Sequence, residues 1–591
     1  MTAAAPLSRG DKLTRRLSAS LEHGVIEITV FTKEGGPLTK RIWLNEDGAL
    51  KSDGSQCIMP TGVARRFRFE RMQNLAAHIG GLQSDQAIAA GSLRADLPDR
   101  VGVVTKRKLN GANHPGIIAR TQDYLIFPPG EAALALVDFD AKGMPPAATA
   151  RIKEKGGFWS ALVSIMPALA AVARVERSST SAGLFDSRTG RDFPGSGGMH
   201  VYLLISDGAD TERFLKALHA RCWLAGLGWM MVGASGQLLE RSIVDRVVGS
   251  PERLAFEGPP VLLPPLAQDK ASRHPSAFEG EALDTIVDCP PLTIIEIARL
   301  KELRAKERHR LVGESAKARE AFVDREGHRL ADRTGMDLRR ARKTIERQCE
   351  GVLLPDVELP FDDPELEGKT GADVLADPAS FEGETLADPL EGVEYGRCKA
   401  RIMRRADGSV WIHSFAHGRT TYELRLDYAA VRAVLERTPK DDLPDAFVRL
   451  VLGADLGADE EERLKHIAAK GSAVGPRALA ATLKSARRKQ AASQAQQERD
   501  RRAAQRRDPR PLLPTPAHDA EFGPEMQALN HVLACDKSAE PPTRNPNKFV
   551  ALAREFRAPS LHALTSAEAN IDDDRPDPAA RPETTAFEAA Q

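Results

Sequence analysis

The sequence has no paired cysteines, no long apolar run and no excess of either charge. Its six cysteines are scattered and none forms a Cys-x-x-Cys pair, which argues against a structural zinc knuckle and fits a reduced, cytoplasmic setting. No stretch approaches the roughly 20 consecutive apolar residues that cross a bilayer, and the N-terminus lacks the apolar core of a secretory signal. Lys and Arg together number 83, as do Asp and Glu, so a nucleic-acid surface would have to be a local patch.

The 591 residues are 42% hydrophobic, which is enough for several globular domains. Between about 100 and 265, apolar strands alternate with amphipathic helices. This order predicts an α+β fold with a central mixed or antiparallel sheet flanked by helices, followed by a helical and small β C-terminal region. Residues 23–49 predict a β-hairpin around a Lys-Glu-Gly-Gly-Pro turn, and GFWSALVSIMPALAAVARV predicts a helical stretch that its proline interrupts.

The stretch ALALVDFDAK, residues 133–142, is an apolar strand that ends with Asp138 and Asp140. Because side chains alternate along a strand, both carboxylates point to the same side. Two neighbouring carboxylates repel each other unless a cation or a proton lies between them. The pair therefore indicates a metal site, and a solvated strand end followed by a turn is the alternative.

Two further stretches carry polar residues that suit such a site. PGSGGMHVYLLI is a glycine-rich turn leading into a strand that begins with His200, and LLERSIVDRVVG carries Asp245. Carboxylates beside a turn that exposes its backbone N–H groups suit a hydrated divalent cation and a polyphosphate. The alternatives are a structural histidine and a surface ion pair of Asp245 with Arg241 or Arg246.

The series LVDFD, SGGMHVY and SIVD resembles the three motifs of the archaeo-eukaryotic primase superfamily, most closely the primase-polymerases of plasmids, phages and integrative elements. The resemblance covers roughly residues 75–265. It implies that Asp138 and Asp140 bind catalytic Mg²⁺ or Mn²⁺. Asp245 would complete the site and help activate the attacking 3′-hydroxyl, and His200 would contact the triphosphate of the incoming nucleotide.

One position departs from the family pattern. The family often has serine two residues before the histidine, where this sequence has Gly198. Ser196 or a backbone N–H, such as that of Gly197, would then take over this nucleotide contact. Arg253, just past the third motif, is either a phosphate contact or a charged loop residue.

The resemblance implies a DNA primase-polymerase that makes primers on a single-stranded DNA template from nucleoside triphosphates, by two-metal-ion nucleotidyl transfer, for replication of a mobile element. Gly368-Lys369-Thr370 ends like a P-loop, but Asp363 replaces the required first glycine, so we expect a separate replicative helicase as a partner. A catalytically inactive, primase-like DNA-binding replication initiator is the alternative, and a metal-dependent nuclease is a third interpretation.

The basic stretches 300–348 and 484–510 suit either phosphate-backbone binding or a solvated helical face. His413 and His417 in WIHSFAHG favour structural roles over a zinc site, because no cysteine pair completes one. The predicted segments are 1–70 with a β-hairpin, 71–290 as the primase-polymerase catalytic domain, 291–350 as a charged helical segment, 351–440 as a linker and small β unit, 441–560 as a helical, basic region, and 561–591 as a disordered tail.

Overall fold

The computed structural model describes residues 24–109, 116–141, 143–405, 408–416 and 418–505. Contacts divide the chain into a unit of residues 1–479 and a unit of residues 480–591. Helices and strands are mixed throughout the first unit, so the α+β class expected from the sequence is confirmed. The predicted tail, 561–591, and His417 lie outside the described residues.

The first sheet has six strands in the order β17-β5-β1-β4-β7-β8. Its central strand β1 (Ile26–Lys33) is almost completely buried on both faces and pairs with β4 (Thr61–Phe69) and β5 (Gln86–Ala89). The other strands are β7 (Arg100–Val104), β8 (Ile117–Ala119) and β17 (Leu254–Ala255).

The hairpin predicted over residues 23–49 is wrong. Both strands exist, but β2 (Arg41–Leu44) pairs with β3 (Leu50–Asp53) and β18 (Val261–Leu262) rather than with β1. The apolar side chains on both faces of β1 explain the difference, because the strand is buried between two hydrophobic cores, with Ile28 and Val30 in one and Phe31 in the other. The Gly-Gly-Pro segment therefore carries the chain from one sheet to another.

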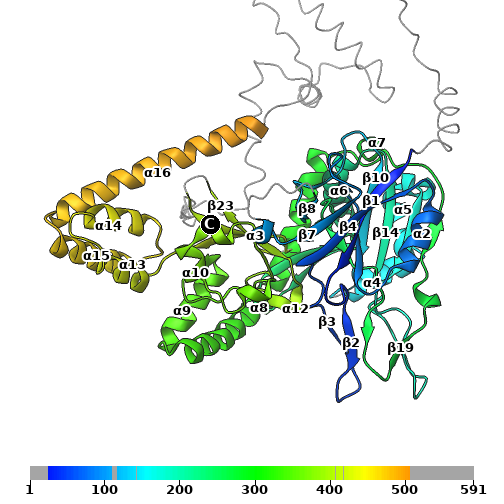
Figure 1. The fold of residues 1–591 in the computed structure, drawn as a ribbon, viewed down its shortest axis with the longest axis horizontal. Coiled ribbons are helices and arrows are strands. Elements are labelled where there is room, and N and C mark those ends of the chain that lie inside the picture. The colour runs from blue at the N-terminus through cyan, green and yellow to red at the C-terminus, as the bar shows by residue number, and fades with distance from the viewer. Residues whose placement is uncertain (1–23, 110–115, 142, 406–407, 417, 506–591) are drawn as a thin grey trace, which may run out of the picture. The chain divides into compact units, whose positions relative to one another are not determined.

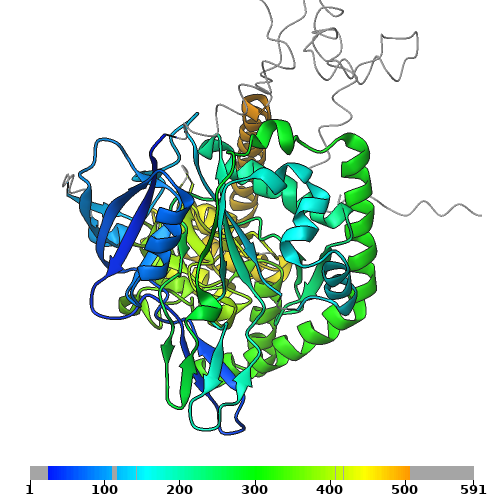
Figure 2. The ribbon, with the colours of Figure 1, turned by 90° about the vertical axis from the view of Figure 1, so that its right-hand side faces the viewer.

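The second sheet holds the predicted motifs and is antiparallel, with the order β10-β14-β11-β20. Its β10 and the strand β1 contribute to one hydrophobic core, and Figure 2 shows this sheet between the blue N-terminal strands and a long green helix. The strands are β10 (Ala133–Phe139), β11 (Arg174–Ser178), β14 (Met199–Ile205) and β20 (Ser276–Phe278), accompanied by α2 (Met72–Gly81), α4 (Pro146–Glu154), α5 (Phe158–Ile165) and α6 (Thr211–Leu224) (Figure 1).

A proline ends one of these helices, as predicted. The helix α5 stops at Ile165, a 3₁₀ turn follows at Pro167–Ala171, and the last two residues of the predicted stretch, Arg174 and Val175, begin strand β11. A two-stranded hairpin of β15 (Gly228–Val232) and β16 (Leu238–Ser242) follows α6. The long helix is α8 (Ile294–Thr334), which begins with a capping box of Thr293 and Glu296 and is followed by α9 (Leu338–Cys349).

The small β unit expected near 395–427 belongs to a five-stranded sheet in the order β21-β25-β24-β23-β22. Its inner face joins α8 and α9 in a separate hydrophobic core. The strands are β21 (Val352–Leu353), β22 (Thr385–Leu386), β23 (Ala400–Arg404), β24 (Val410–Ser414) and β25 (Thr421–Leu424).

The other elements are short or lie toward the C-terminus. They are β6 (Ser92–Leu93), β9 (Leu125–Ile126), β12 (Leu184–Asp186), β13 (Asp192–Phe193), β19 (Leu266–Gln268), α3 (Lys106–Leu109), α7 (Thr285–Asp288), α10 (Gly371–Ala376), α11 (Pro378–Phe381), α12 (Gly392–Tyr395), α13 (Tyr428–Leu435), α14 (Leu443–Leu452), α15 (Ala458–Gly471) and α16 (Pro476–Gln505).

Among the described residues, no helix combines the length and the apolar character that a membrane span requires.

Candidate active site

Three polar residues form a row across the second sheet. The antiparallel register places Asp138 of β10 directly opposite His200 of β14, and His200 directly opposite Arg177 of β11. Directly opposed residues share one face of a sheet, so the first and second predicted motifs meet there. The Nε2 atom of His200 lies 3.6 Å from Oδ1 of Asp138.

The third predicted motif lies beside the first. The backbone N–H of Asp245 donates a 3.1 Å hydrogen bond to the carbonyl of Asp138, and Oδ1 of Asp245 accepts one of 2.9 Å from the N–H of Val247. Burial raises the pKa of Asp138, and the charges of Asp245 and Asp140 raise it further while His200 opposes them. Asp140 and Asp245 are therefore each within electrostatic range of Asp138.

A fully buried carboxylate, Glu257, contacts Nδ1 of His200, the ring nitrogen that does not face Asp138. Its Oε1 lies 2.5 Å from Nδ1 of His200 and accepts a 2.7 Å hydrogen bond from the hydroxyl of Tyr202. Burial disfavours the imidazolium, but Glu257 and Asp138 outweigh it and raise the pKa of His200 to about 9. The histidine therefore carries a positive charge at neutral pH, which suits contact with a phosphate oxygen.

Two buried arginines compensate the negative charge of Glu257. Nη2 of Arg273 lies 3.3 Å and Nη1 of Arg177 3.4 Å from Oε2 of the carboxylate. Burial opposes ionisation of Glu257, but His200 and the two arginines lower its pKa to about 2. Sequence reasoning missed all three residues, because their roles depend on contacts between distant segments and no motif spacing marks them.

The glycine-rich turn meets a serine-rich turn, RSSTSAGL at 177–184. The hydroxyls of Ser179, Ser181 and Ser196 lie 2.9 to 3.2 Å from one another. Ser196 also accepts a 3.3 Å hydrogen bond from the N–H of Gly198, and a Cβ at Gly198 would stand 3.0 Å from the carbonyl oxygen of Phe139. Gly198 thus allows the turn to approach the end of the strand that carries the aspartates, and Ser196 lies beside it as the predicted substitute. Gly197, with a φ of 70°, supplies the left-handed bend of the turn.

A lysine just before strand β23 lies within electrostatic range of the same carboxylates. Burial lowers the pKa of Lys399 to about 8, with Arg253 and Arg241 acting in the same direction and Asp245 and Asp138 opposing them. The ammonium lies 5.7 Å from the centroid of the Tyr395 ring. The predicted phosphate contact Arg253 therefore belongs to a small group of cations beside the aspartates, and Lys399 is a member that sequence reasoning missed.

The backbone before Lys399 is held in an uncommon conformation. Cys398 has a φ of 54°, which is rare for a residue other than glycine, and its N–H donates a 3.0 Å hydrogen bond to Oδ2 of Asp362. Glu391 fixes the same segment to the β15–β16 turn by accepting from the N–H of Ala234 and the hydroxyl of Ser235, each at 2.9 Å. These contacts position the segment that carries Lys399.

The donor set fits a hard divalent cation. Asp138, Asp140 and Asp245 offer carboxylate oxygens, and Mg²⁺ commonly binds one or two carboxylates together with substrate phosphates and water. Within the described ranges, no three His, Cys, Asp or Glu side chains are already arranged as a closed metal-binding group.

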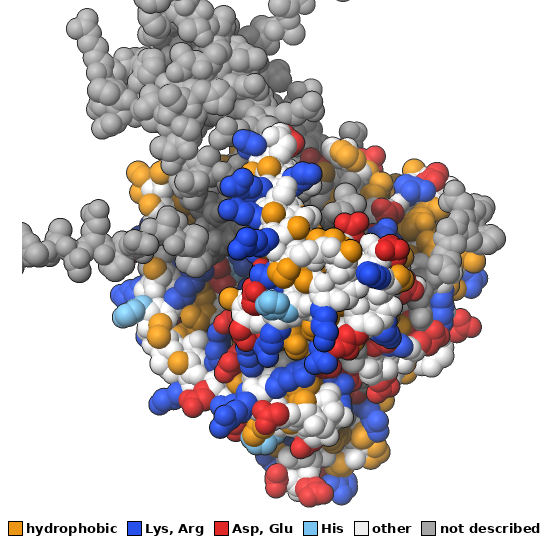
Figure 3. Space-filling model, turned by 90° about the vertical axis from the view of Figure 1, so that its left-hand side faces the viewer, with side chains coloured by type: hydrophobic (Ala, Val, Ile, Leu, Met, Phe, Trp, Pro, Cys, Tyr) orange, Lys and Arg blue, Asp and Glu red, His pale blue; other side chains and the backbone are white. Residues whose placement is uncertain are grey.

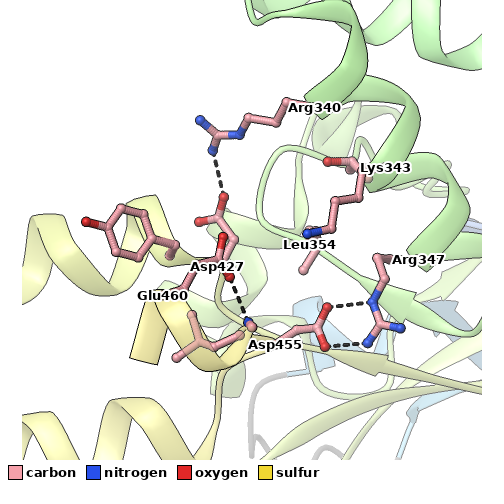
Figure 4. Close-up of a pocket in the computed structure, with 11 residues that line it drawn as sticks. Arg340, Lys343, Arg347, Leu354, Asp427, Asp455 and Glu460 are labelled. Carbon is pink, nitrogen blue, oxygen red and sulfur yellow. Dashed lines mark hydrogen bonds and ion pairs between the residues drawn. The ribbon is translucent and has the colours of Figure 1, made fainter. Parts of the chain in front are cut away.

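A separate cavity of about 290 Å³ lies between α9 and the helices that follow the five-stranded sheet (Figure 4). Arg340 reaches Asp427 at 2.7 Å, and Nε of Arg347 reaches Asp455 at 2.6 Å. The basic face of α9 is therefore paired with acidic residues here, which indicates a structural junction more than a phosphate site.

Exposed basic residues are distributed unevenly. In Figure 3, Lys and Arg side chains gather in a column in the upper part of the view. The predicted basic stretch 484–510 falls on α16 as far as Gln505, where Lys484, Arg488 and Lys489 are exposed.

Comparison of the chain with family models, with curated proteins and with solved structures gives no match. The resemblance to primase-polymerases therefore rests on the three motifs and on the arrangement of their residues.

Proposed function

We propose that this protein is a metal-dependent nucleotidyltransferase, a primase-polymerase that builds primers on single-stranded DNA from nucleoside triphosphates. The observation that carries the proposal is the position of Asp245 next to Asp138, with His200 directly across the sheet. The same residue types in the same chain order form the three motifs of the resembling family. Replication of a mobile element, with a separate helicase, is the setting that the resemblance implies.

The proposal assigns a task to each residue of the site. Asp138, Asp140 and Asp245 would hold Mg²⁺ or Mn²⁺, which supplies charge stabilisation to the attacking and leaving oxygens. Asp245 accepts the proton of the 3′-hydroxyl as that oxygen bonds to the α-phosphorus. The bond from the α-phosphorus to the bridging oxygen breaks, and pyrophosphate leaves with the electron pair. His200 and Lys399 hold the negative triphosphate in place.

An inactive, DNA-binding initiator remains the competing proposal, and one observation favours it. The ammonium of Lys399 interacts with Asp138 and Asp245, where it partly compensates the charge that a metal would otherwise neutralise. In the active enzyme, a triphosphate would draw Lys399 away from the carboxylates. In an inactive protein, Lys399 would remain there.

Incorporation of a labelled nucleotide on a single-stranded template, with Mg²⁺ or Mn²⁺, tests both proposals. We expect wild-type protein to extend or start a strand, and Asp138→Asn to lose activity by about 10³-fold or more. The exposed Asp123→Asn serves as the matched control and should retain activity. Absence of incorporation by wild-type protein with either metal would overturn the enzyme proposal, and shortening of the template would support a nuclease.

A further inference from the structure

Three rings project from one face of β24. Alternate residues of this strand are buried in the core beneath the sheet, so Trp411 and His413, together with Phe415 just beyond the strand, lie on the opposite face and remain partly exposed. The ring centroids of Trp411 and His413 are 5.6 Å apart, and those of His413 and Phe415 are 4.8 Å apart, both in edge-to-face geometry. The rings therefore form one continuous row.

The register connects this row to the candidate active site. On the neighbouring strand β23, Arg401 lies directly opposite His413, and the N–H of Phe415 donates a 2.7 Å hydrogen bond to the carbonyl of Lys399. Lys399 is two residues before Arg401, so the alternation places both on the face that carries the rings. Lys399 also interacts with Asp138. The Phe415 end of the row is thus the end nearest the carboxylates.

Cations accompany the rings. The guanidinium of Arg405 lies 5.4 Å from the centroid of Trp411 and pairs with Glu423 of β25. Arg401 lies beside His413, and within the described part of the chain its buried Nε has no hydrogen-bond partner. Burial, and then the charge of Arg401, lower the pKa of His413, so its ring is neutral at pH 7.

We propose that Trp411, His413 and Phe415, with Arg401 and Arg405, form a stacking platform for the unpaired bases of a single-stranded nucleic acid. Aromatic rings on a sheet surface stack against bases of any sequence, and neighbouring arginines attract the phosphates. The platform guides the strand toward Lys399 and the aspartates. The choice of nucleic acid as the ligand rests on the proposed function, but the platform is a binding site outside the three motifs.

Binding of a fluorescently labelled oligothymidylate of about 16 nucleotides, followed by anisotropy without added nucleotide, tests the platform. We expect Trp411→Ala and Phe415→Ala each to weaken binding about tenfold, from the loss of one stacked base. Trp411→Phe keeps a ring and should restore most of the affinity. Trp43→Ala removes a half-buried tryptophan from β2 and should bind as wild type does.

An oligonucleotide of the same length that lacks bases separates stacking from charge. Stacking predicts that Trp411→Ala binds this abasic strand as tightly as wild type does, whereas Arg401→Gln binds it more weakly. Equal losses on both oligonucleotides, or unchanged affinity in both alanine variants, would overturn the platform. Thermal melting identifies a variant that fails to fold, in which case Trp411→Leu and Phe415→Leu decide, because both fill the space without a ring.

The two proposals fail separately. Asp138→Asn should bind the oligothymidylate normally while losing incorporation. If wild-type protein incorporates no nucleotide but Trp411→Ala still binds the strand more weakly, the platform stands and the enzyme proposal falls. If incorporation occurs and the ring variants bind normally, the platform alone falls.

Discussion

The backbone N–H of Asp245 donates a 3.1 Å hydrogen bond to the carbonyl oxygen of Asp138. This bond joins the segment after β16 to the end of β10, although the two are far apart in the chain. It matters because carboxylates bind a common cation only when their backbones are held side by side. The same strand end is paired to His200, so one residue of each of the three motifs lies at this end of β10.

Replacement of Glu257 by glutamine should affect both folding and nucleotide binding. Arg177 and Arg273 would lose their buried counter-charge, so we expect a loss of about 3–5 kcal/mol in the free energy of unfolding. His200 would keep at most a neutral acceptor at Nδ1 and lose the negative charge that raises its pKa, so the KM for the nucleotide should rise more than kcat falls. Urea unfolding and steady-state incorporation measure the two effects.

The variant Tyr202→Phe provides the matched control for Glu257. It removes a single 2.7 Å hydrogen bond to the carboxylate and should lower stability by only about 1 kcal/mol. Its nucleotide KM should remain close to that of wild type. A KM unchanged in Glu257→Gln would show that His200 does not need Glu257 for its position.

Loss of the positive charge at Lys399 should weaken nucleotide binding. We expect Lys399→Gln to raise the KM for the triphosphate about 10- to 100-fold, the range for a lost hydrogen bond to a charged group, and Lys399→Arg to recover part of it. Steady-state incorporation measures both, with the exposed Lys51→Gln as control. Unchanged or increased activity in Lys399→Gln would mean that the lysine competes with the metal.

Glu391 should control activity through the docking of the segment that carries Lys399. Glu391→Ala removes an acceptor from Ala234, Ser235 and Gln237, so stability should fall by about 3 kcal/mol. Nucleotide incorporation by Glu391→Ala should fall about as far as it does in Lys399→Gln. The exposed neighbour Glu394→Ala should change neither quantity. Full activity in a destabilised Glu391→Ala protein would show that Lys399 reaches the site without this contact.

The sequence predicts those parts of the fold that depend on residues within one short segment of the chain. The apolar runs of β10 and β14 predict buried strands, and Pro167 predicts the end of α5. Partners of a strand are not local, which is why the pattern of β1 suggested a hairpin with β2 where the chain instead forms two sheets.

The candidate site divides in the same way. Asp138, His200 and Asp245 carry a recognisable motif order, so their residue types and positions could be predicted. Glu257 and Lys399 act only because folding brings them beside those residues, and neither belongs to a motif. A carboxylate in a proline-rich segment has no sequence signal that distinguishes a buried partner of histidine from an exposed charge.

The buried carboxylate Glu240 should make the stability of the protein depend on acid pH. Its Oε1 lies 3.0 Å from Nε2 of His219 on α6 and 2.5 Å from Arg304 on α8, so it joins two helices to β16. Burial opposes its ionisation, but His219, Arg246 and Arg304 outweigh burial and lower its pKa to about 2.

The pKa of Glu240 is lower in the folded protein than in the unfolded chain, where it is near 4.5, so ionised Glu240 stabilises the folded protein above pH 4.5. This stabilisation is lost as the pH falls toward 2. Glu240→Gln lacks this titration. The difference in unfolding free energy between wild type and Glu240→Gln should therefore be about 1 kcal/mol smaller at pH 4 than at pH 7, and smaller still at pH 3. Urea midpoints at the three pH values measure it, with the exposed Glu302→Gln as control. A difference independent of pH would show that Glu240 is not ionised in the folded protein, and its contacts with Arg304 and His219 would then be hydrogen bonds of a neutral acid.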